Sequence, residues 1–292
     1  HLSNNPNAPR FASLTGAHGD LILSTDELGH DSEFWLTGLD GFYGGVGVNS
    51  NDTARKLSHG MVPAAATRTG RTLTLRAWML FDDDATRSIA DRFLSGLLWD
   101  GKQGTLAVTV QNQTLTTQVR LDGEIKHSYD GMRAINFEIP LFAADPFLYG
   151  EPIVYQAFPA GSGVGLRYPL YAPEPQGNLF YGQQAPRYVG ATNEGNATAH
   201  PTYTIQGEWS SGVRITSNDG KVIEYPYPIT TTSPITIDCA RGACLIAGRD
   251  ASNRLSARQW HTIPPRSGFL PLIEALAPAT GWVDITVKDT YI

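Results

Sequence analysis

The seven histidines and two cysteines of this 292-residue chain are the side chains best suited to metal or acid–base chemistry. The histidines are scattered, and neither the His-Glu-x-x-His spacing of zinc proteases nor a Cys-x-x-Cys pair occurs. The sequence also lacks a Gly-x-Ser-x-Gly nucleophile elbow and a phosphate-binding loop. His200, before Pro201, and His261, beside Trp260, are interpreted as strand-edge or surface residues. We therefore predict no catalytic residue, no metal site and no cofactor, and we expect no enzyme.

Three further groups of residues carry no specific signal of chemistry. The run Asp82–Asp84 precedes an apolar stripe of helical spacing, so it can cap a helix start. Consecutive helical residues point in different directions, which makes a shared metal site there a poor interpretation. The glycine-rich run 41–47 lacks the Gly-x-Gly-x-x-Gly pattern of dinucleotide sites. Cys239 and Cys244 flank a hairpin loop, and both a disulfide and two free thiols remain open.

The composition favours β-strands joined by turns. The chain contains 30 glycines and 19 prolines, and its formal net charge of −6 argues against a general nucleic-acid binder. No apolar run approaches the roughly 20 residues of a membrane-spanning helix. The first 20 residues lack the apolar core of a signal peptide, so we expect synthesis in the cytoplasm.

Hydrophobic periodicity predicts the elements that must position these residues. A strand alternates over 71–80, and a helix runs over 84–99 and closes at Gly101. The apolar stripe of this helix consists of Ile89, Phe93, Leu94, Leu97 and Leu98. Further strands are predicted at 105–110, 115–121, 133–141, 202–206, 213–216, 221–225, 234–238, 243–247 and 282–287. The fold class is therefore mainly β with one helix.

The chain is expected to form two domains. Residues 1–150 carry the first set of strands and the helix, and residues 190–292 have the short, regularly spaced strands of a β-sandwich. Between them, residues 151–189 are rich in proline, glycine and tyrosine. Because aromatic side chains prefer to pack, we expect an ordered, extended arm there rather than a floppy linker.

Two segments carry a more specific signal. The strand FEIPLFAADPFLYG, residues 137–150, ends in Asp145-Pro146, and NEGNATAHPTYTIQG spans residues 193–207. These segments resemble those of phage distal tail proteins, the Dit family of long non-contractile tails. The second motif is carried by Asn193, Gly195, Asn196, Pro201, Ile205 and Gly207. Gly195 and Asn196 tolerate left-handed turn conformations, and a strand is expected to start at Pro201, where a missing N–H does least harm.

The order of the remaining elements agrees with this resemblance. Gly70-Arg71 leads through a strand to the single helix, a hairpin and the Asp-Pro strand. Segment 258–272 is similar to a tryptophan-containing stretch of the family, but PPRSGFL at 264–270 replaces its short turn. The departure puts only the local turn in doubt.

The resemblance implies a structural virion protein of the tail tip. Its N-terminal domain would form a hexameric ring, and a galectin-like β-sandwich would lie outside that ring. The implied partners are the tail tube protein, the tape-measure protein and tail-associated or receptor-binding proteins. Arg71 and Arg76 are predicted at ring interfaces, where arginines pair well with carboxylates. The acidic charge predicts a neutral or acidic channel through which DNA passes without specific binding.

Three alternatives remain open from the sequence. The sandwich could be a carbohydrate-binding module for cell-wall glycans, in which Trp209 and Trp260 stack on sugars while Trp282 is better explained as a core residue. The protein could be a polysaccharide hydrolase with two carboxylates about 5–10 Å apart. It could also be a related tube or baseplate subunit with a similar ring domain.

Overall fold

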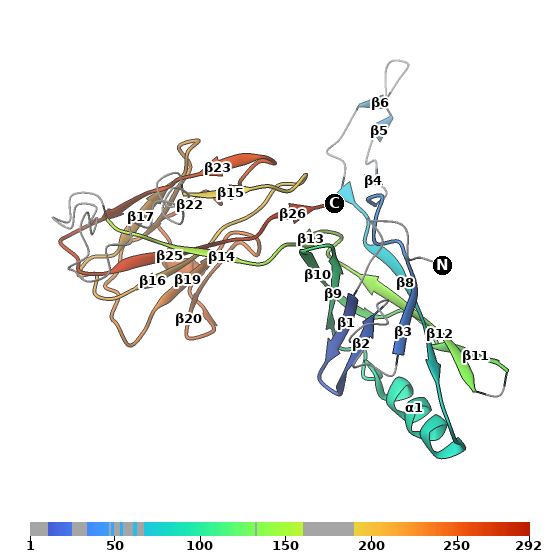
Figure 1. Ribbon diagram of the computed structural model, residues 1–292. Coiled ribbons are helices and arrows are strands. Elements are labelled where there is room, and N and C mark those ends of the chain that lie inside the picture. The colour runs from blue at the N-terminus through green and yellow to red at the C-terminus, as the bar shows by residue number, and fades with distance from the viewer. Residues whose placement is uncertain are drawn as a thin grey trace, which may run out of the picture. The chain divides into compact units, whose positions relative to one another are not determined.

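The structure is a computed structural model that describes residues 11–24, 34–46, 48–49, 53–54, 61–62, 67–131, 133–159 and 190–292 (Figure 1). Of the described residues, 53% lie in strands and 7% in helix, which confirms the mainly β class. The chain divides into two compact units: one contains residues 1–150 with Ile292, and the other contains residues 151–291.

The N-terminal unit is a closed seven-stranded β-barrel. Neighbouring strands follow the order β12-β8-β3-β2-β1-β9-β10, and β10 pairs with β12 to close the ring. All these pairs are antiparallel except β2 with β3. The barrel strands are β1 Phe11–Gly16, β2 Gly19–Ser24, β3 Phe34–Asp40, β8 Arg71–Leu80, β9 Gly104–Val110, β10 Gln113–Leu121 and β12 Ala134–Ala143.

Shorter strands extend this barrel. β11 Lys126–Asp130 pairs with the first half of β12 on the side away from β8, and β13 Leu148–Tyr149 pairs with β10. Two short ladders lie between β3 and β8 in the sequence: β4 Val48–Asn49 with β7 Thr67–Arg68, and β5 Thr53–Ala54 with β6 Met61–Val62.

Alternating side chains of β8 and β12 contribute to the core of the barrel. Leu73, Leu75, Ala77 and Met79 of β8 are buried, and the intervening residues point outward. On β12, Ile135, Phe137, Ile139 and Leu141 are buried in the same way. Both inward faces agree with the predicted alternation.

The helix α1 is Asp84–Gly96, three residues shorter than predicted. Asp83 caps it by accepting a hydrogen bond from the Thr86 backbone N–H at 2.7 Å. The predicted stripe is wrong at Ile89, whose side chain is 66% exposed. Leu94, Leu97 and Leu98 of that stripe are buried as predicted, and within the helix Ala90 lies on the same face as Leu94, four residues earlier.

The C-terminal unit is a sandwich of two main sheets. One sheet has the order β14-β25-β16-β19-β20-β21, and the other has the order β22-β18-β17-β24. The strands of the first are β14 Ile153–Ala157, β16 Thr202–Gln206, β19 Ile235–Asp238, β20 Ala243–Ile246, β21 Arg249–Asp250 and β25 Trp282–Val287. Those of the second are β17 Val213–Thr216, β18 Val222–Tyr225, β22 Ala257–Arg258 and β24 Leu272–Ala275.

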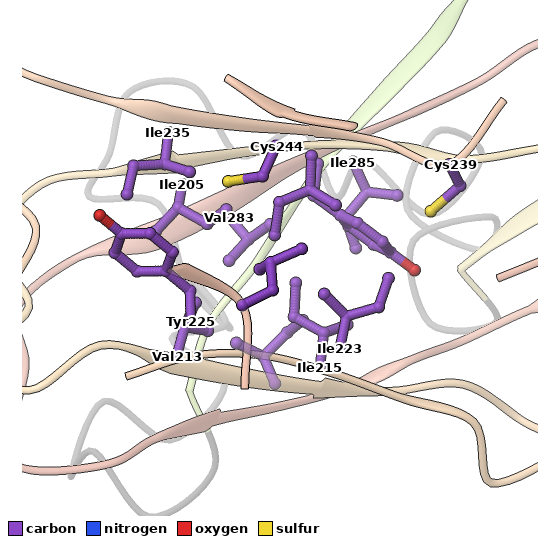
Figure 2. Close-up of a cluster of buried hydrophobic side chains, with 14 of the residues drawn as sticks. Ile205, Val213, Ile215, Ile223, Tyr225, Ile235, Cys239, Cys244, Val283 and Ile285 are labelled. Atoms are coloured by element: carbon purple, nitrogen blue, oxygen red, sulfur yellow. The ribbon is translucent and has the colours of Figure 1, made fainter. Parts of the chain in front are cut away.

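Side chains from both sheets meet in one core (Figure 2). Ile205 and Ile285 come from the six-stranded sheet, and Ile215 and Ile223 come from the four-stranded sheet. The unit also contains the pair β15 Ala191–Asn193 with β23 Ser267–Phe269, the 3-10 helix η1 Ser252–Arg254 and β26 Thr290–Tyr291. β23 occupies the place of the short family turn that the sequence put in doubt.

Part of the predicted arm belongs to this sandwich. β14, residues 153–157, pairs along its whole length with β25. Tyr155 and Ala157 pack against the core. The segment forms a strand because its side chains alternate, although the sequence around it is rich in proline. Residues 160–189 of the arm lie outside the described residues.

Cys239 and Cys244 are free, buried thiols (Figure 2). In the β19–β20 register, Cys244 lies opposite Ile237, and the last pair is Asp238 with Ala243, so the two cysteines are not cross-strand partners. Burial raises the pKa of Cys239 to about 12 and that of Cys244 to about 11. Both thiols therefore stay protonated and act as core residues.

Candidate functional site

The Asp145-Pro146 motif forms a turn that is held from inside the barrel unit. Asp145 accepts hydrogen bonds from the Phe147 backbone N–H at 3.1 Å and from the Tyr149 hydroxyl at 2.5 Å. The Pro146 carbonyl accepts a 2.9 Å hydrogen bond from Nε of Arg71, the first residue of β8. The motif therefore fastens the segment after β12 to the start of β8.

Arg71 joins a third segment to this turn. Its Nη1 donates to the carbonyls of Gly41 at 3.0 Å and Phe42 at 2.7 Å, just after β3. A Cβ at Gly41, whose φ is +82°, would overlap the Thr72 carbonyl. Only glycine therefore lets the chain approach β8 here.

The predicted ring-interface role of Arg71 is wrong. The side chain is 1% exposed, and its donors point to backbone carbonyls rather than to carboxylates. Arg71 has the same strand parity as Leu73 and Met79, so the alternation of β8 already directed it inward. Burial lowers its pKa from the ordinary value. We call such a residue a staple, because its hydrogen bonds hold distant backbone segments together inside one unit.

Asn193 performs the corresponding task in the sandwich unit. Its side chain is fully buried, and Nδ2 donates to the carbonyls of Ala197 at 2.7 Å and Ile263 at 3.1 Å. Its Oδ1 accepts from the backbone N–H groups of Gly195 at 3.0 Å and Thr290 at 3.3 Å. One amide thus connects three distant segments of the unit.

Gly195 is required for close approach rather than for its backbone conformation. Neither Gly195 nor Asn196 has a positive φ, so the turn does not use the left-handed conformation that both residues tolerate. A Cβ at Gly195 would overlap the carbonyl oxygen of Thr290. The Asn196 side chain is exposed. The Asn-x-Gly segment therefore brings its own backbone against the last strand of the chain.

Pro201 and Gly207 bracket β16, and Trp209 follows them. The strand starts one residue after Pro201, whose carbonyl accepts from the Cys239 backbone N–H at 3.2 Å. Gly207 has a φ of +79° and lies against Gly281. Trp209 is 1% exposed, and its Nε1 donates to the Gln206 carbonyl at 2.8 Å. The interpretation of Trp209 as a sugar-stacking residue is therefore wrong.

Trp260 and His261 are the other aromatic candidates. Trp260 is half-buried against the core, so its glycan role stays a prediction. His261 is fully buried, which corrects its interpretation as a strand-edge or surface residue. Its ring shares a 2.6 Å hydrogen bond with the Tyr203 hydroxyl and a 2.9 Å one with the Lys221 carbonyl. Burial lowers the pKa of His261, which favours the neutral ring.

Arg76 lies on the outer face of the barrel. Its guanidinium forms ion pairs with Asp40 of β3 and, at 3.2 Å, with Glu138 of β12. All three side chains are substantially exposed, so the cluster can meet another molecule. The predicted role of Arg76 in a ring interface remains a prediction.

The same outer face carries features that sequence analysis missed. An open groove of about 360 Å³ crosses β3, β8, β12 and β11, and Thr37, Arg76, Lys126 and Asn136 are among its lining residues. Beside it, the half-buried rings of Trp35 and Trp78 stack with centroids 5.6 Å apart. The alternation of β8 predicts that Arg76 and Trp78 point outward. It does not predict which residues of β3 and β12 lie beside them.

No group of three metal-ligating side chains occurs among the described residues. Asp40 and Glu138, the carboxylates beside the groove, share one arginine. No helix in the described ranges is long and apolar enough to cross a membrane. The side chains of Arg71 and Asn193 are internal staples, and Arg76 and Arg214 each form ion pairs with two carboxylates.

The fold places the chain in a class of β-proteins in which a barrel unit is followed by a β-sandwich unit. Solved structures have a similar fold. No family profile matches the chain, and no curated protein sequence matches it. The structure is similar to that of the Dit protein of phage SPP1, described as a paradigm of the hub of the adsorption apparatus in phages infecting Gram-positive bacteria. The TM-score is 0.61 at 14% identity, over 96% of this chain and 99% of that one.

A second likeness involves the baseplate of phage P2 in its activated conformation with calcium. The TM-score is 0.51 at 9% identity, over 96% of this chain and 98% of that one. The strontium form of that baseplate gives 0.50 with the same coverage. The protein therefore has a Dit-like fold, as the two sequence motifs indicated.

Proposed function

We propose that this protein is a structural subunit of a phage tail tip, six copies of which form a ring between the tail tube and the host-recognition apparatus. The observation that carries the proposal is the likeness to the SPP1 hub protein over nearly the full length of both chains. A likeness limited to one unit would fit many barrels or sandwiches. One that spans both units favours a shared two-part architecture, and the proposal extends the task of the SPP1 protein to this chain by analogy of fold.

The two units have separate tasks in this proposal. Residues 1–150 make the ring, and the sandwich of residues 190–292 lies outside it, with 151–189 connecting them. The ring contacts the tail tube and tape-measure proteins on one side. It contacts tail-associated or receptor-binding proteins on the other. The virion tail tip is then the place of action.

The charges of the protein support a channel through which DNA passes without binding tightly. The net charge is −6, and the exposed Arg76 is already neutralised by Asp40 and Glu138. Unpaired basic side chains would instead bind phosphates and release counterions. Binding of a host glycan by the sandwich is not part of the proposal, since among the predicted stacking residues only Trp260 remains half-exposed.

Immunogold labelling of the virions that contain this protein tests the proposal. Antibodies against the purified protein should label one end of the tail, opposite the head. An antibody against the tube protein serves as the control and should label the whole tail length. Gold along the whole tail would favour a tube subunit, and unlabelled virions would contradict a structural role.

A further inference from the structure

Arginines gather in one stretch of the sandwich unit, although the chain as a whole is acidic. Residues 241–266 contain five arginines, one aspartate and no lysine or glutamate, whereas the formal net charge of the whole chain is −6. The five are Arg241, Arg249, Arg254, Arg258 and Arg266, and all of them are exposed. This stretch is therefore a local positive region on an acidic protein.

Three of these arginines lie where the chain passes from one sheet of the sandwich to the other. β21 is an edge strand of the six-stranded sheet, β22 is an edge strand of the four-stranded sheet, and η1 lies between them in the chain. Arg249 belongs to β21, Arg254 to η1 and Arg258 to β22. We call these three residues the arginine edge.

Strand register turns Arg249 and Arg258 toward the same side of the sandwich. Arg249 lies opposite Ile246, which packs against the core, so it shares the inward face of the six-stranded sheet. Arg258 lies opposite the fully buried Ile223 and shares the inward face of the other sheet. Directly paired residues of a ladder point to the same face. Because both strands are edges, the two arginines remain exposed on the open side where the sheets are connected.

Two tyrosines hold Arg254 in place. Its Nη1 donates a 3.3 Å hydrogen bond to the Tyr225 hydroxyl, and its guanidinium carbon lies 5.8 Å from the centroid of the Tyr227 ring. The two tyrosine rings pack edge to face with centroids 5.6 Å apart. A guanidinium has five N–H donors, so most of those on Arg254 remain for a ligand. The side chain is therefore positioned in advance, and its charge is kept.

No carboxylate neutralises the arginine edge in the part of the chain that the structure describes. By contrast, Arg214 of the same unit pairs with both Glu224 and Glu274. Asp250, the one acidic residue within 241–266, follows Arg249 and lies on the opposite face of β21. It accepts hydrogen bonds from the backbone N–H and the hydroxyl of Ser252 at 2.9 and 2.5 Å. Three positive charges therefore face solvent together.

We propose that the arginine edge binds a linear polymer that carries phosphate groups in its main chain. The planar donor fork of a guanidinium matches phosphate oxygens. Charges on three successive elements can meet successive phosphates of an extended chain. Affinity then comes from neutralised charge and released counterions. The inference concerns the sandwich unit alone and is independent of the proposed ring.

An acidic protein surface fits this edge less well. A stable protein interface has a desolvated centre of apolar and aromatic side chains. Among the described residues, Tyr227 is the large hydrophobic side chain exposed beside the arginines. The other exposed hydrophobic residues of the sandwich lie on or next to β14 and β24, which are the opposite edges of the two sheets. The arginine edge therefore offers charge without an apolar centre.

A nucleic acid also fits less well than a chain without bases. Proteins that bind single-stranded nucleic acids present aromatic rings on which the bases stack. The Tyr227 ring already carries the Arg254 guanidinium and contacts Tyr225. The arginine edge can therefore bind phosphates, but it adds no stacking platform for bases.

Fluorescence polarisation of end-labelled inorganic polyphosphate with the full chain tests the site. The logarithm of the binding constant should fall by about 2 per tenfold rise in salt, since a single-stranded chain loses about 0.7 per neutralised phosphate. Arg249→Gln with Arg258→Gln should weaken binding at least tenfold and reduce this slope to about 0.7.

A matched variant controls for the lost charge. Arg241→Gln with Arg266→Gln removes the same charge from two exposed turns outside the arginine edge, before β20 and before β23. It should change the affinity less than twofold. Both double variants should keep the melting temperature of the unmodified chain, because all four side chains are exposed. Equal losses of affinity in the two variants, or no binding of polyphosphate at physiological salt, would overturn the proposal.

Two further probes distinguish the phosphate chain from other anionic partners. Single-stranded DNA with the same number of phosphates should bind no tighter than polyphosphate. Poly-glutamate of the same charge should bind at least tenfold more weakly, because each of its charges lies on a side chain that loses freedom on binding. Tighter binding of DNA would assign the edge to a nucleic acid, and equal binding of poly-glutamate would assign it to an acidic protein. Either result would overturn the proposal.

Discussion

Arg71 in the barrel unit and Asn193 in the sandwich unit do the same work with different chemistry. Each is a buried side chain that gathers backbone groups from segments far apart in the sequence. Asn193 is neutral, and both its amide atoms have partners. Arg71 brings a charge into the interior, and its buried Nη2 has no partner among the described residues.

This difference shows two ways to fasten a family motif. A neutral amide both donates and accepts, so it can satisfy N–H and C=O groups together. A guanidinium only donates, so it suits a place where three carbonyls converge. The Asp-Pro turn and the Asn-x-Gly turn therefore stabilise the fold. Substitutions that disrupt them should lower folding stability first and impair assembly only as a consequence.

The largest effect is expected for Asn193→Asp. The new carboxylate keeps the shape but cannot donate to the carbonyls of Ala197 and Ile263. A buried charge facing carbonyls should lower the free energy of unfolding of the sandwich by about 4 kcal/mol. Urea unfolding at pH 7 measures this.

Acid should partly reverse that loss. Burial raises the pKa of the introduced carboxyl above its unfolded value, so lowering the pH neutralises it in the folded state and restores stability. Asn193→Ala is the control, because it has no group to titrate. An equal response of both variants to acid would contradict the account of Asn193.

Arg71→Met should weaken the barrel by about 3 kcal/mol. It removes three hydrogen bonds and leaves the carbonyls of Gly41, Phe42 and Pro146 without their donor. Arg120→Met is a matched control, because Arg120 is exposed beside the Phe142 ring. If both substitutions change the urea midpoint of the barrel equally, Arg71 is not a staple.

A smaller, pH-dependent effect is expected at His261. Its folded pKa is lowered, so the unfolded chain binds a proton that the folded sandwich rejects. The contribution is complete above about pH 6.5 and is lost as the pH falls below that value. Thermal unfolding between pH 7 and 5 should show a shallower loss in His261→Gln than in the unmodified chain. A steeper loss in the variant would refute the assignment.

The smallest effect on folding is expected for Arg76→Ala. The arginine is exposed, and solvent screens its pairs with Asp40 and Glu138. The melting temperature of the barrel should stay nearly unchanged, while the mass of the assembled protein falls. Lost barrel stability with an unchanged mass would reverse the contrast between Arg76 and Arg71.

Sequence patterning predicted the parts of this molecule that follow from local alternation. The strands near 71–80 and 133–141 and most sandwich strands lie within a few residues of their predicted bounds. The alternation of β8 also indicated that Arg71 is buried, because residues 71, 73 and 75 share a face. The interface prediction set that parity aside because arginine forms good bidentate pairs with carboxylates at interfaces.

Other features depend on contacts between distant segments and leave no local pattern. His261 and Trp209 lie outside alternating strands, so their burial follows only from how the two sheets pack. The role of Gly195 depends on Thr290, almost one hundred residues later. The outer-face cluster of Asp40, Arg76 and Glu138 likewise needs the pairing of three strands.

The mass of the purified protein in solution tests the central claim most directly. Light scattering coupled to size-exclusion chromatography should give six times the 31.7 kDa of one chain. Arg71 and Asn193 would then be internal staples of a ring subunit. A mass of one chain, unchanged across a tenfold rise in concentration, would contradict the ring.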